Sequence, residues 1–474
     1  SWEELVQAQV AASRSPAWAP LNELGPETHG SLVEIILKSL YVQRDALREH
    51  IDAAQQRFAT VAQPLAERLG IVAAQFFQEA EALQSKSARV ARVLEDPRWA
   101  NDFARLRCMF SGIIRTADDG PLAQWSRRFV IENMATKWVE MAAAAVVYVT
   151  KLGLTSPVSV AARGIISDIL RLVGQYVHDQ LTMTPAAELN PVWRSCDRIL
   201  QVFKQLHSYI SANRSSGKVD EQEWAVDVLE LLRMLTNMPE RDALDFSEDT
   251  GGENGQDQIS VVAVVLQGTQ LVFPLIDQKL LQYEGVAEQL YKLLVTLIQC
   301  YPEQVTQFQG SSFLPLVNAL EFGVKDHRVV VARAAFEAIA ALADFHGSHT
   351  RQGGAGLAGN LRPWGPSKPS VLLHLLQQVF NFVVFQTFDS SLLNPAANAM
   401  LALIVCEQEA FGPMVDQILL SQSDAAQRER LSRAFRALVQ DNGFQPAYNL
   451  QGRRAFQKNL LAFASEVRGF LRTN

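Results

Sequence analysis

Cysteine is scarce in this chain of 474 residues, which contains only Cys108, Cys196, Cys300 and Cys406. The four are widely separated, and the last three each fall within an apolar, helix-like run. Cysteines this far apart and set in apolar helical runs are typical of buried thiols rather than of a disulfide framework or a zinc site. We therefore expect buried free thiols in a reducing compartment, with no disulfide and no metal site.

Long hydrophobic runs and strand-like alternation are also missing. Apolar runs such as Val261–Leu266 stay far below the ~20 residues that a membrane helix requires. No membrane span is expected. The chain begins at Ser1 with neither a methionine nor a leader-like segment, so we expect further sequence upstream.

Positive charge is in deficit, because the net charge is −7 and the pI is about 5.7. Nucleic-acid binding needs a basic surface, and we expect no nucleic-acid partner. The charge is unevenly distributed along the chain. From Asp424 to the end there are nine bases and four acids. Seven acids and one base, Arg241, lie between Glu240 and Gln258, and the acids are Glu240, Asp242, Asp245, Glu248, Asp249, Glu253 and Asp257.

Catalytic and cofactor motifs are absent or out of context. The chain has no Walker loop, no Gly-x-Ser-x-Gly elbow and no His-Glu-x-x-His. Residues 354–359 match a dinucleotide fingerprint, but a helix precedes them and prolines follow, where binding needs a strand and then a helix. His346 and His349 lack further ligands and are interpreted as a solvated pair in a loop. We predict a binding protein that is not an enzyme, with no catalytic residue, cofactor or metal.

What the sequence does contain is helical periodicity almost throughout. Apolar residues such as Phe456, Leu460, Phe463 and Val467 recur every three or four positions. Helices are predicted at 28–40, 42–69, 71–94, 97–117, 132–152, 158–181, 192–211, 221–237, 259–273, 286–300, 313–324, 329–345, 371–386, 394–406, 411–421, 431–439 and 456–471.

The spacing of these helices predicts antiparallel pairs of about 40 residues, the period of HEAT or armadillo repeats. We therefore predict an all-α fold, an α-solenoid of HEAT-like helix pairs. The alternative is a globular helical bundle, but a single core rarely grows beyond ~250–300 residues.

Two segments are predicted to interrupt the repeats. HEAT-like repeats at 1–239 are followed by an acidic loop at 240–258, repeats at 259–346, a flexible Gly/Pro-rich loop at 347–369 and C-terminal repeats at 370–474. The acidic loop either attracts a basic partner or is a solvated insertion. Its candidate partner-binding residues are Asp242, Asp245, Glu248, Asp249, Glu253 and Asp257. The basic C-terminal helices likewise either bind an acidic partner or serve solubility.

Several strings resemble the exportin-4 family of nuclear transport receptors, within the importin-β (karyopherin) superfamily. They occur in the order expected of the C-terminal half of that family. They include Glu230–Asn237 (ELLRMLTN), Val264–Ile276 (VVLQGTQLVFPLI), Gln289–Val305 (QLYKLLVTLIQCYPEQV), Asn318–Val324 (NALEFGV), Leu419–Val439 (LLSQSDAAQRERLSRAFRALV) and Phe456–Leu471 (FQKNLLAFASEVRGFL).

The resemblance implies a receptor that wraps protein cargo in a manner dependent on GTP-bound Ran and shuttles between nucleus and cytoplasm. Its implied partners are Ran, gripped mainly by repeats of the N-terminal half, protein cargo such as the hypusine-containing translation factor, and nucleoporins. The alternative hypothesis is a HEAT-repeat scaffold of a larger cytoplasmic complex that binds partners regardless of nucleotide.

Overall fold

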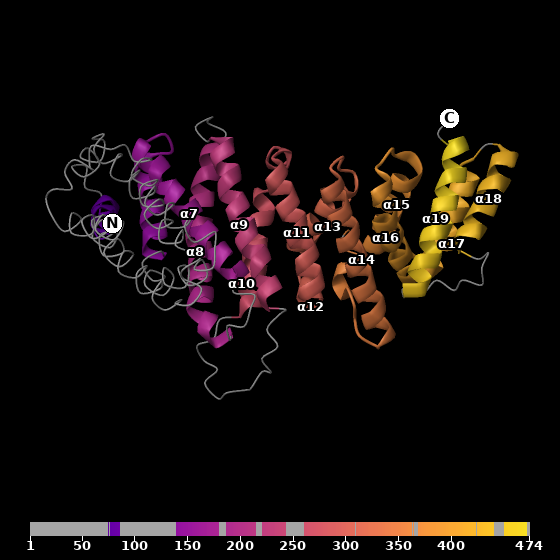
Figure 1. The fold of residues 1–474 in the computed structure, drawn as a ribbon, viewed down its shortest axis with the longest axis horizontal. Helices are drawn as coiled ribbons and strands as arrows, with labels where there is room; N and C mark the ends of the chain where they lie inside the picture. Colours follow the sequence, from indigo (N-terminus) through magenta and orange to yellow (C-terminus); the bar gives the residue numbers. More distant parts are fainter. Residues whose placement is uncertain are drawn as a thin grey trace, which may run out of the picture. The chain divides into compact units, whose positions relative to one another are not determined.

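The computed structural model describes residues 74, 76–85, 139–179, 186–214, 220–242, 260–308, 310–362, 364, 368–422, 424–439 and 450–471. Every regular element in these ranges is helical, and none is a strand (Figure 1). The predicted all-α class is confirmed. The chain divides into two compact units, Ser1–Leu271 and Val272–Asn474, called unit 1 and unit 2 below.

Unit 1 contains helices over 76–84 and 139–152, then α7 (Pro157–Asp179), α8 (Ala186–Arg214), α9 (Glu221–Asp242) and α10, which begins at Val261 and ends at Val272. The other helices predicted before residue 132 lie outside the described residues. Asp220 begins α9 as an N-cap, since its Oδ1 accepts from the N–H groups of Gln222 and Glu223 at 2.9 and 3.3 Å.

The helices α7 and α9 form the main interface of unit 1. They approach closely at Gly174, where a Cβ atom would lie 3.4 Å from the backbone of Met234. Asn237 Nδ2 donates to the carbonyl of Gly174 at 2.9 Å, which joins the two helices at the same point. A Cβ at this distance would make an ordinary van der Waals contact, so the helices approach closely here without requiring glycine.

Unit 2 contains η2 (Phe273–Leu275), η3 (Leu280–Gln282), α11 (Glu284–Cys300), α12 (Pro302–Thr306), α13 (Gly310–Val324), α14 (Val329–Arg351), η4 (Ala358–Asn360), α15 (Val371–Phe385), η5 (Ser390–Leu392), α16 (Leu393–Cys406), α17 (Gln408–Leu420), α18 (Ala425–Val439) and α19 (Leu450–Leu471). Each helix predicted in this part of the chain is present, but α18 and α19 begin earlier than predicted, and the short helix α12 is not among the predictions.

The helices of unit 2 form two layers (Figure 1). In one layer α11, α14, α16 and α19 follow one another as neighbours. In the other, α13 packs on α14, α15 on α16, and α18 on α19. Each pair therefore contacts chiefly the next pair, which is the arrangement of a solenoid.

Aromatic side chains join the C-terminal helices α15, α18 and α19 of unit 2. Phe380 of α15, Phe435 of α18 and Phe463 of α19 form a cluster with ring centroids 5.0–6.2 Å apart. Arg468 of α19 donates from Nε and Nη2 to the carbonyl of Val383, at 2.8 and 2.6 Å, near the end of α15. These contacts tie α15, α18 and α19 into one core.

The loop predicted at 347–369 begins differently in the structure, because α14 continues to Arg351. Gly347 lies inside the helix and is buried, and a Cβ at this position would lie 3.1 Å from Cys406 Sγ of α16. Close packing against α16 thus outweighs the low helix propensity of glycine. The predicted boundary at residue 346 falls short of the real helix end.

The two histidines of this region are also not a solvated loop pair. His346 and His349 lie in the last turns of α14, and their Nδ1 atoms accept from the N–H groups of Leu357 and Gly356, each at 3.1 Å. Leu357 is buried, and Gly356 has a φ of +53°, a conformation that favours glycine. The described part of the Gly-rich segment is therefore folded back onto α14.

No single helix in the described ranges is long and apolar enough to cross a bilayer. The segments Ser390–Cys406 and Gln408–Leu420, bent by 112°, meet the length and composition test only when taken together.

Candidate functional site

A groove of ≈ 780 Å³ lies within the layer of unit 2 that contains α11, α14, α16 and α19. The lining residues come from these four helices and from the start of α12. They are Ile298, Gln299, Pro302, Glu337, Ala340, Ala341, Asp344, Phe345, Ser348, Asn394, Pro395, Asn398 and Arg453. We call this the α14 groove, because α14 supplies the largest share of its lining. Its volume is within the range of protein binding sites.

The floor of the α14 groove exists because α14 is rich in alanine. Ala340 and Ala341 stand where larger residues would fill the space between the neighbouring helices. Ile298, Phe345 and Pro395 complete the apolar surface. The lining therefore combines apolar residues with amide and charged side chains.

Amide side chains stand along both edges. Gln299 is exposed on α11, Asn394 is exposed on α16, and Asn398 lies one turn further along α16. Gln457 of α19 donates from Nε2 to Asn398 Oδ1 at 3.0 Å. This contact uses the Asn398 oxygen and leaves its N–H₂ group as the donor, since none of the residues that the structure describes accepts from it.

Charge in the groove is mixed. Burial raises the pKa of Asp344, and the positive charges of Arg351 and Arg453 and a hydrogen bond with Ser348 oppose that rise. Glu337 is exposed at the edge. Because two arginines accompany Asp344, the groove has no strong excess of either sign.

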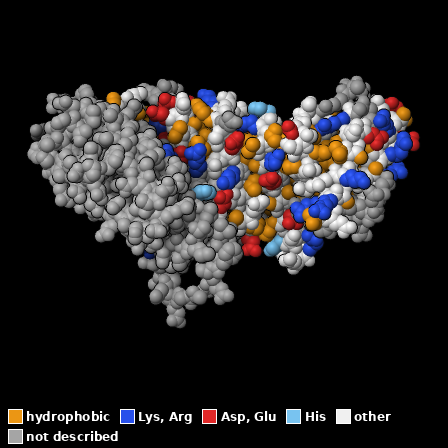
Figure 2. Space-filling view, in the orientation of Figure 1, with side chains coloured by type: hydrophobic (Ala, Val, Ile, Leu, Met, Phe, Trp, Pro, Cys, Tyr) orange, Lys and Arg blue, Asp and Glu red, His pale blue; other side chains and the backbone are white. Residues whose placement is uncertain are grey.

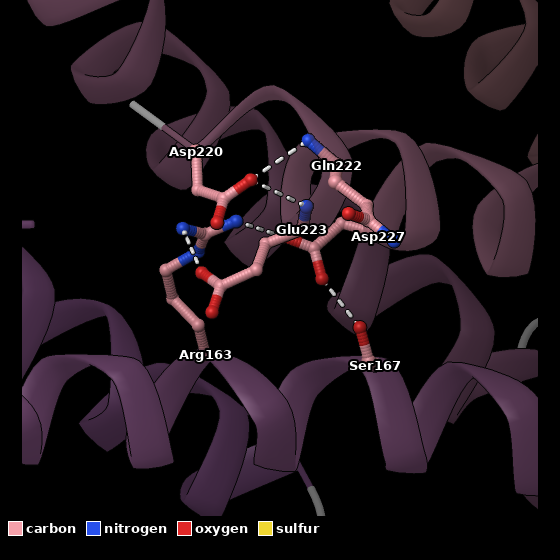
Figure 3. A network of polar contacts seen from close by, with 6 residues as sticks. All are labelled: Arg163, Ser167, Asp220, Gln222, Glu223 and Asp227. Atoms are coloured by element: carbon pink, nitrogen blue, oxygen red, sulfur yellow. Dashed lines mark hydrogen bonds and ion pairs between the residues drawn. The ribbon is translucent and has the colours of Figure 1, made fainter. Parts of the chain in front are cut away.

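A second polar cluster lies in unit 1 between α7 and α9 (Figure 3). Arg163 Nη1 donates to Glu223 and Nη2 to Asp227, both at 2.9 Å, and Ser167 Oγ donates to the other oxygen of Asp227. The side chains of Arg163 and Asp227 are 4% exposed. Burying these charges needs pairing, and the two carboxylates bind Nη1 and Nη2 of Arg163, while its buried Nε has no hydrogen-bond partner within the described ranges. We interpret this cluster as a structural contact that holds α7 and α9 together.

The basic C-terminal region forms part of an exposed surface. Figure 2 shows Lys and Arg side chains over α18 and α19. Arg433, Arg454 and Lys458 are exposed, and they have no acidic partner among the residues that the structure describes. Arg430 pairs with Glu466 at 3.2 Å, and both side chains are largely solvated, so this pair contributes little to stability.

The acidic segment is the one site that the sequence singled out for partner binding. Asp242 is the last residue of α9. The other five candidates, Asp245, Glu248, Asp249, Glu253 and Asp257, lie outside the described residues.

Of the three cysteines in the described ranges, only Cys196 is fully buried as expected, whereas Cys300 and Cys406 are half-buried. Cys196 is buried, which raises the pKa of its thiol, and burial also raises the pKa of Cys406 to about 11. Cys406 Sγ donates to the carbonyl of Ala343 at 3.0 Å. A thiol with a raised pKa is a poor nucleophile and a poor metal ligand. Groups of three or more potential metal ligands are absent from the described ranges.

Sequence reasoning missed the α14 groove. Two signals in the sequence relate to it: the adjacent small residues Ala340 and Ala341 within α14, and the amides Asn394 and Asn398 four positions apart on α16. Neither signal shows that helices distant in the sequence will meet around those positions.

A comparison with models of protein families matches residues 139–474 to the family described as Exportin-4. The match covers all of the labelled helices, from α7 to α19, and therefore includes the groove.

Proposed function

Because the chain belongs to the exportin-4 family of nuclear export receptors, we propose that it carries protein cargo out of the nucleus in a complex that depends on GTP-bound Ran. The observation that carries this proposal is the family match over residues 139–474. A transport receptor needs binding surfaces rather than a reaction centre, so we also propose that the chain has no enzymatic activity.

The helical layers of unit 2 support a mechanism based on many weak contacts. Each helix pair contacts chiefly its neighbours, so small changes between pairs can adapt a binding surface to a large folded protein. Affinity then depends on several repeats together. Loss of one contact should weaken a complex without abolishing it.

The partners of the proposed receptor are Ran, protein cargo and nucleoporins, and its location alternates between nucleus and cytoplasm. Its cargo includes the hypusine-containing translation factor. With a net charge of −7, the chain is poorly suited to nucleic acid. No membrane association is proposed. The acidic segment 240–258 attracts basic surfaces of Ran or cargo, because clustered charge of one sign speeds association with the opposite sign.

A reconstituted pull-down tests the proposal. The immobilised chain, extended to its full natural length, is incubated with the hypusine-containing factor and with Ran locked in the GTP or the GDP state. We expect retention of the factor to rise with GTP-bound Ran. Equal retention with both nucleotides contradicts export activity and favours a nucleotide-independent scaffold.

The role of the acidic segment needs its own variant. Changing Asp245, Glu248, Asp249, Glu253 and Asp257 to their amides should slow complex formation, most clearly at low salt. The matched control removes the same number of charges from exposed acids elsewhere, Glu140→Gln, Glu303→Gln, Glu409→Gln, Asp416→Asn and Glu429→Gln. If both variants slow association equally, only net charge matters and the segment has no specific role.

A further inference from the structure

We propose that the α14 groove binds an extended segment of a partner protein and holds it mainly through the main-chain N–H and C=O groups of that segment. This inference rests on the proposed function only in taking the chain to be a protein-binding receptor. It concerns one local site, whereas export activity concerns the whole complex.

The length of the groove suits a short extended segment. Its lining on α14 runs from Glu337 to Ser348. At a helix rise of 1.5 Å per residue, this distance is about 16 Å. An extended chain advances about 3.3 Å per residue, so about five residues can lie along it.

The spacing of the amides suits a main chain. Asn394 and Asn398 are one turn apart on α16, which separates them by about 6 Å along the helix. Alternate residues of an extended chain are about 6.6 Å apart and present their polar groups in the same direction. Asn394 offers both a donor and an acceptor, and Asn398 offers its N–H₂ donor, which match the C=O and N–H groups of peptide units.

The donors are partly fixed before a ligand binds. Gln457 donates to Asn398 Oδ1, which sets the orientation of the Asn398 side chain and points to its N–H₂ group as a donor for a carbonyl. Gln299 stands on the opposite edge, on α11. An oriented side chain loses less conformational entropy on binding, which favours affinity.

The remaining lining defines the chemical class of the segment. Ala340, Ala341 and Phe345 offer an apolar floor for one or two small apolar side chains. Asp344 is accompanied by Arg351 and Arg453, so a strongly charged ligand of either sign gains no clear advantage. A neutral, extended segment with apolar side chains fits these properties best.

The test uses a library of random hexapeptides with capped ends, screened against the wild-type chain. The best binders are then measured by fluorescence polarisation against the double variant Asn394→Ala/Asn398→Ala. We expect binding about tenfold weaker than wild type, since two hydrogen bonds are lost. The control is Gln417→Ala, which removes an exposed amide from α17 outside the groove and should leave binding unchanged.

Two further measurements separate main-chain recognition from other causes. Peptides methylated on alternate backbone nitrogens should bind the wild-type chain about tenfold more weakly, and this result does not depend on the folding of any variant. Ala341→Trp should also abolish binding by filling the floor. The proposal is overturned if no peptide binds, if methylation has no effect, or if Asn394→Ala/Asn398→Ala binds as well as Gln417→Ala. None of these assays contains Ran or cargo, so their failure leaves the export proposal standing.

Discussion

The interface between α7 and α9 in unit 1 and the interface between α15, α18 and α19 in unit 2 use different chemistry. The first encloses Arg163, Asp227 and their partners, whereas the second is built on aromatic rings and one arginine at its edge. A buried ion cluster fails when one member is removed, because the others are left charged in an apolar setting. Aromatic packing loses stability in proportion to the volume removed. The two interfaces should therefore respond differently to comparable substitutions.

The largest effect is expected from Asp227→Ala, which leaves Arg163 buried without its main partner. We expect α7 and α9 to be destabilised by about 3–5 kcal/mol. Hydrogen exchange of peptides from both helices, read by mass spectrometry, measures the change. The control is Gln222→Ala in α9, whose exposed side chain should contribute less than about 0.5 kcal/mol.

A double variant shows whether pairing or charge itself matters in that cluster. Arg163→Met combined with Asp227→Leu removes both charges and should recover much of the loss, because apolar residues of similar size often replace buried ion pairs well. If the double variant is no more stable than Asp227→Ala, the loss comes from packing and not from an unpaired charge.

A smaller effect is expected in unit 2 from Phe463→Leu, which shortens one member of the aromatic cluster. The loss should be about 1.5 kcal/mol, since a buried hydrophobic group of similar volume remains. Hydrogen exchange of peptides from α18 and α19 measures this loss of stability. Leu461→Ala on the same helix, where the side chain is 57% exposed, should change stability by less than about 0.5 kcal/mol. If Phe463→Leu destabilises the protein more than Asp227→Ala does, the aromatic interface is the more sensitive of the two, contrary to this expectation.

Arg468→Lys tests the polar edge of the same cluster. Arg468 donates twice to the carbonyl of Val383 and lies 4.3 Å from the centre of the Phe388 ring. Lysine keeps the charge but loses the planar fork, so we expect a loss of about 1 kcal/mol. The measurement is the hydrogen-exchange rate of the backbone amides at the end of α15. An unchanged rate would show that the positive charge alone stabilises this end.

The smallest effect concerns pH and the segment folded back onto α14. Burial lowers the pKa of His346, and the charge on His349 adds to this. The unfolded state therefore binds the proton more readily than the folded state. The stabilising contribution is complete above the unfolded pKa of about 6.5 and decreases as pH falls through the lower folded pKa. Protonation of His346 Nδ1 also removes the acceptor for Leu357 N–H.

We expect the Leu357 amide to exchange faster at pH 5.5 than at pH 7.5, after correction for intrinsic rates. His346→Asn is the control, because Asn Oδ1 can accept from the same amide without titrating. The same pH response in that variant would exclude His346 as the cause.

Much of the fold could be predicted from the sequence, because the apolar period of helices such as α11, α15 and α19 is set by local residues. Helix ends were harder to predict. The end of α14 was placed at Phe345, since glycine at 347 signals a stop, whereas contact with Cys406 of α16 carries the helix further. The histidine contacts were missed for a related reason, since they depend on how residues 356 and 357 fold back.

The candidate site was less accessible to sequence reasoning. The acids at 240–258 attract notice because they are adjacent in the chain. The residues of the α14 groove are separated by up to 155 positions, from Ile298 to Arg453, and each is ordinary by itself. A single asparagine on a helix does not by itself indicate a binding site, because its role depends on its neighbours in space.

The amino-acid sequence by itself determined the helical class, the pairing of helices at a regular period and the family, because these depend on local periodicity and on the order of residues along the chain. Only the tertiary structure decided which polar residues are buried together, as Arg163 and Asp227 are, and where small residues leave a groove. The physical reason is that burial and cavity formation are properties of several segments packed against each other.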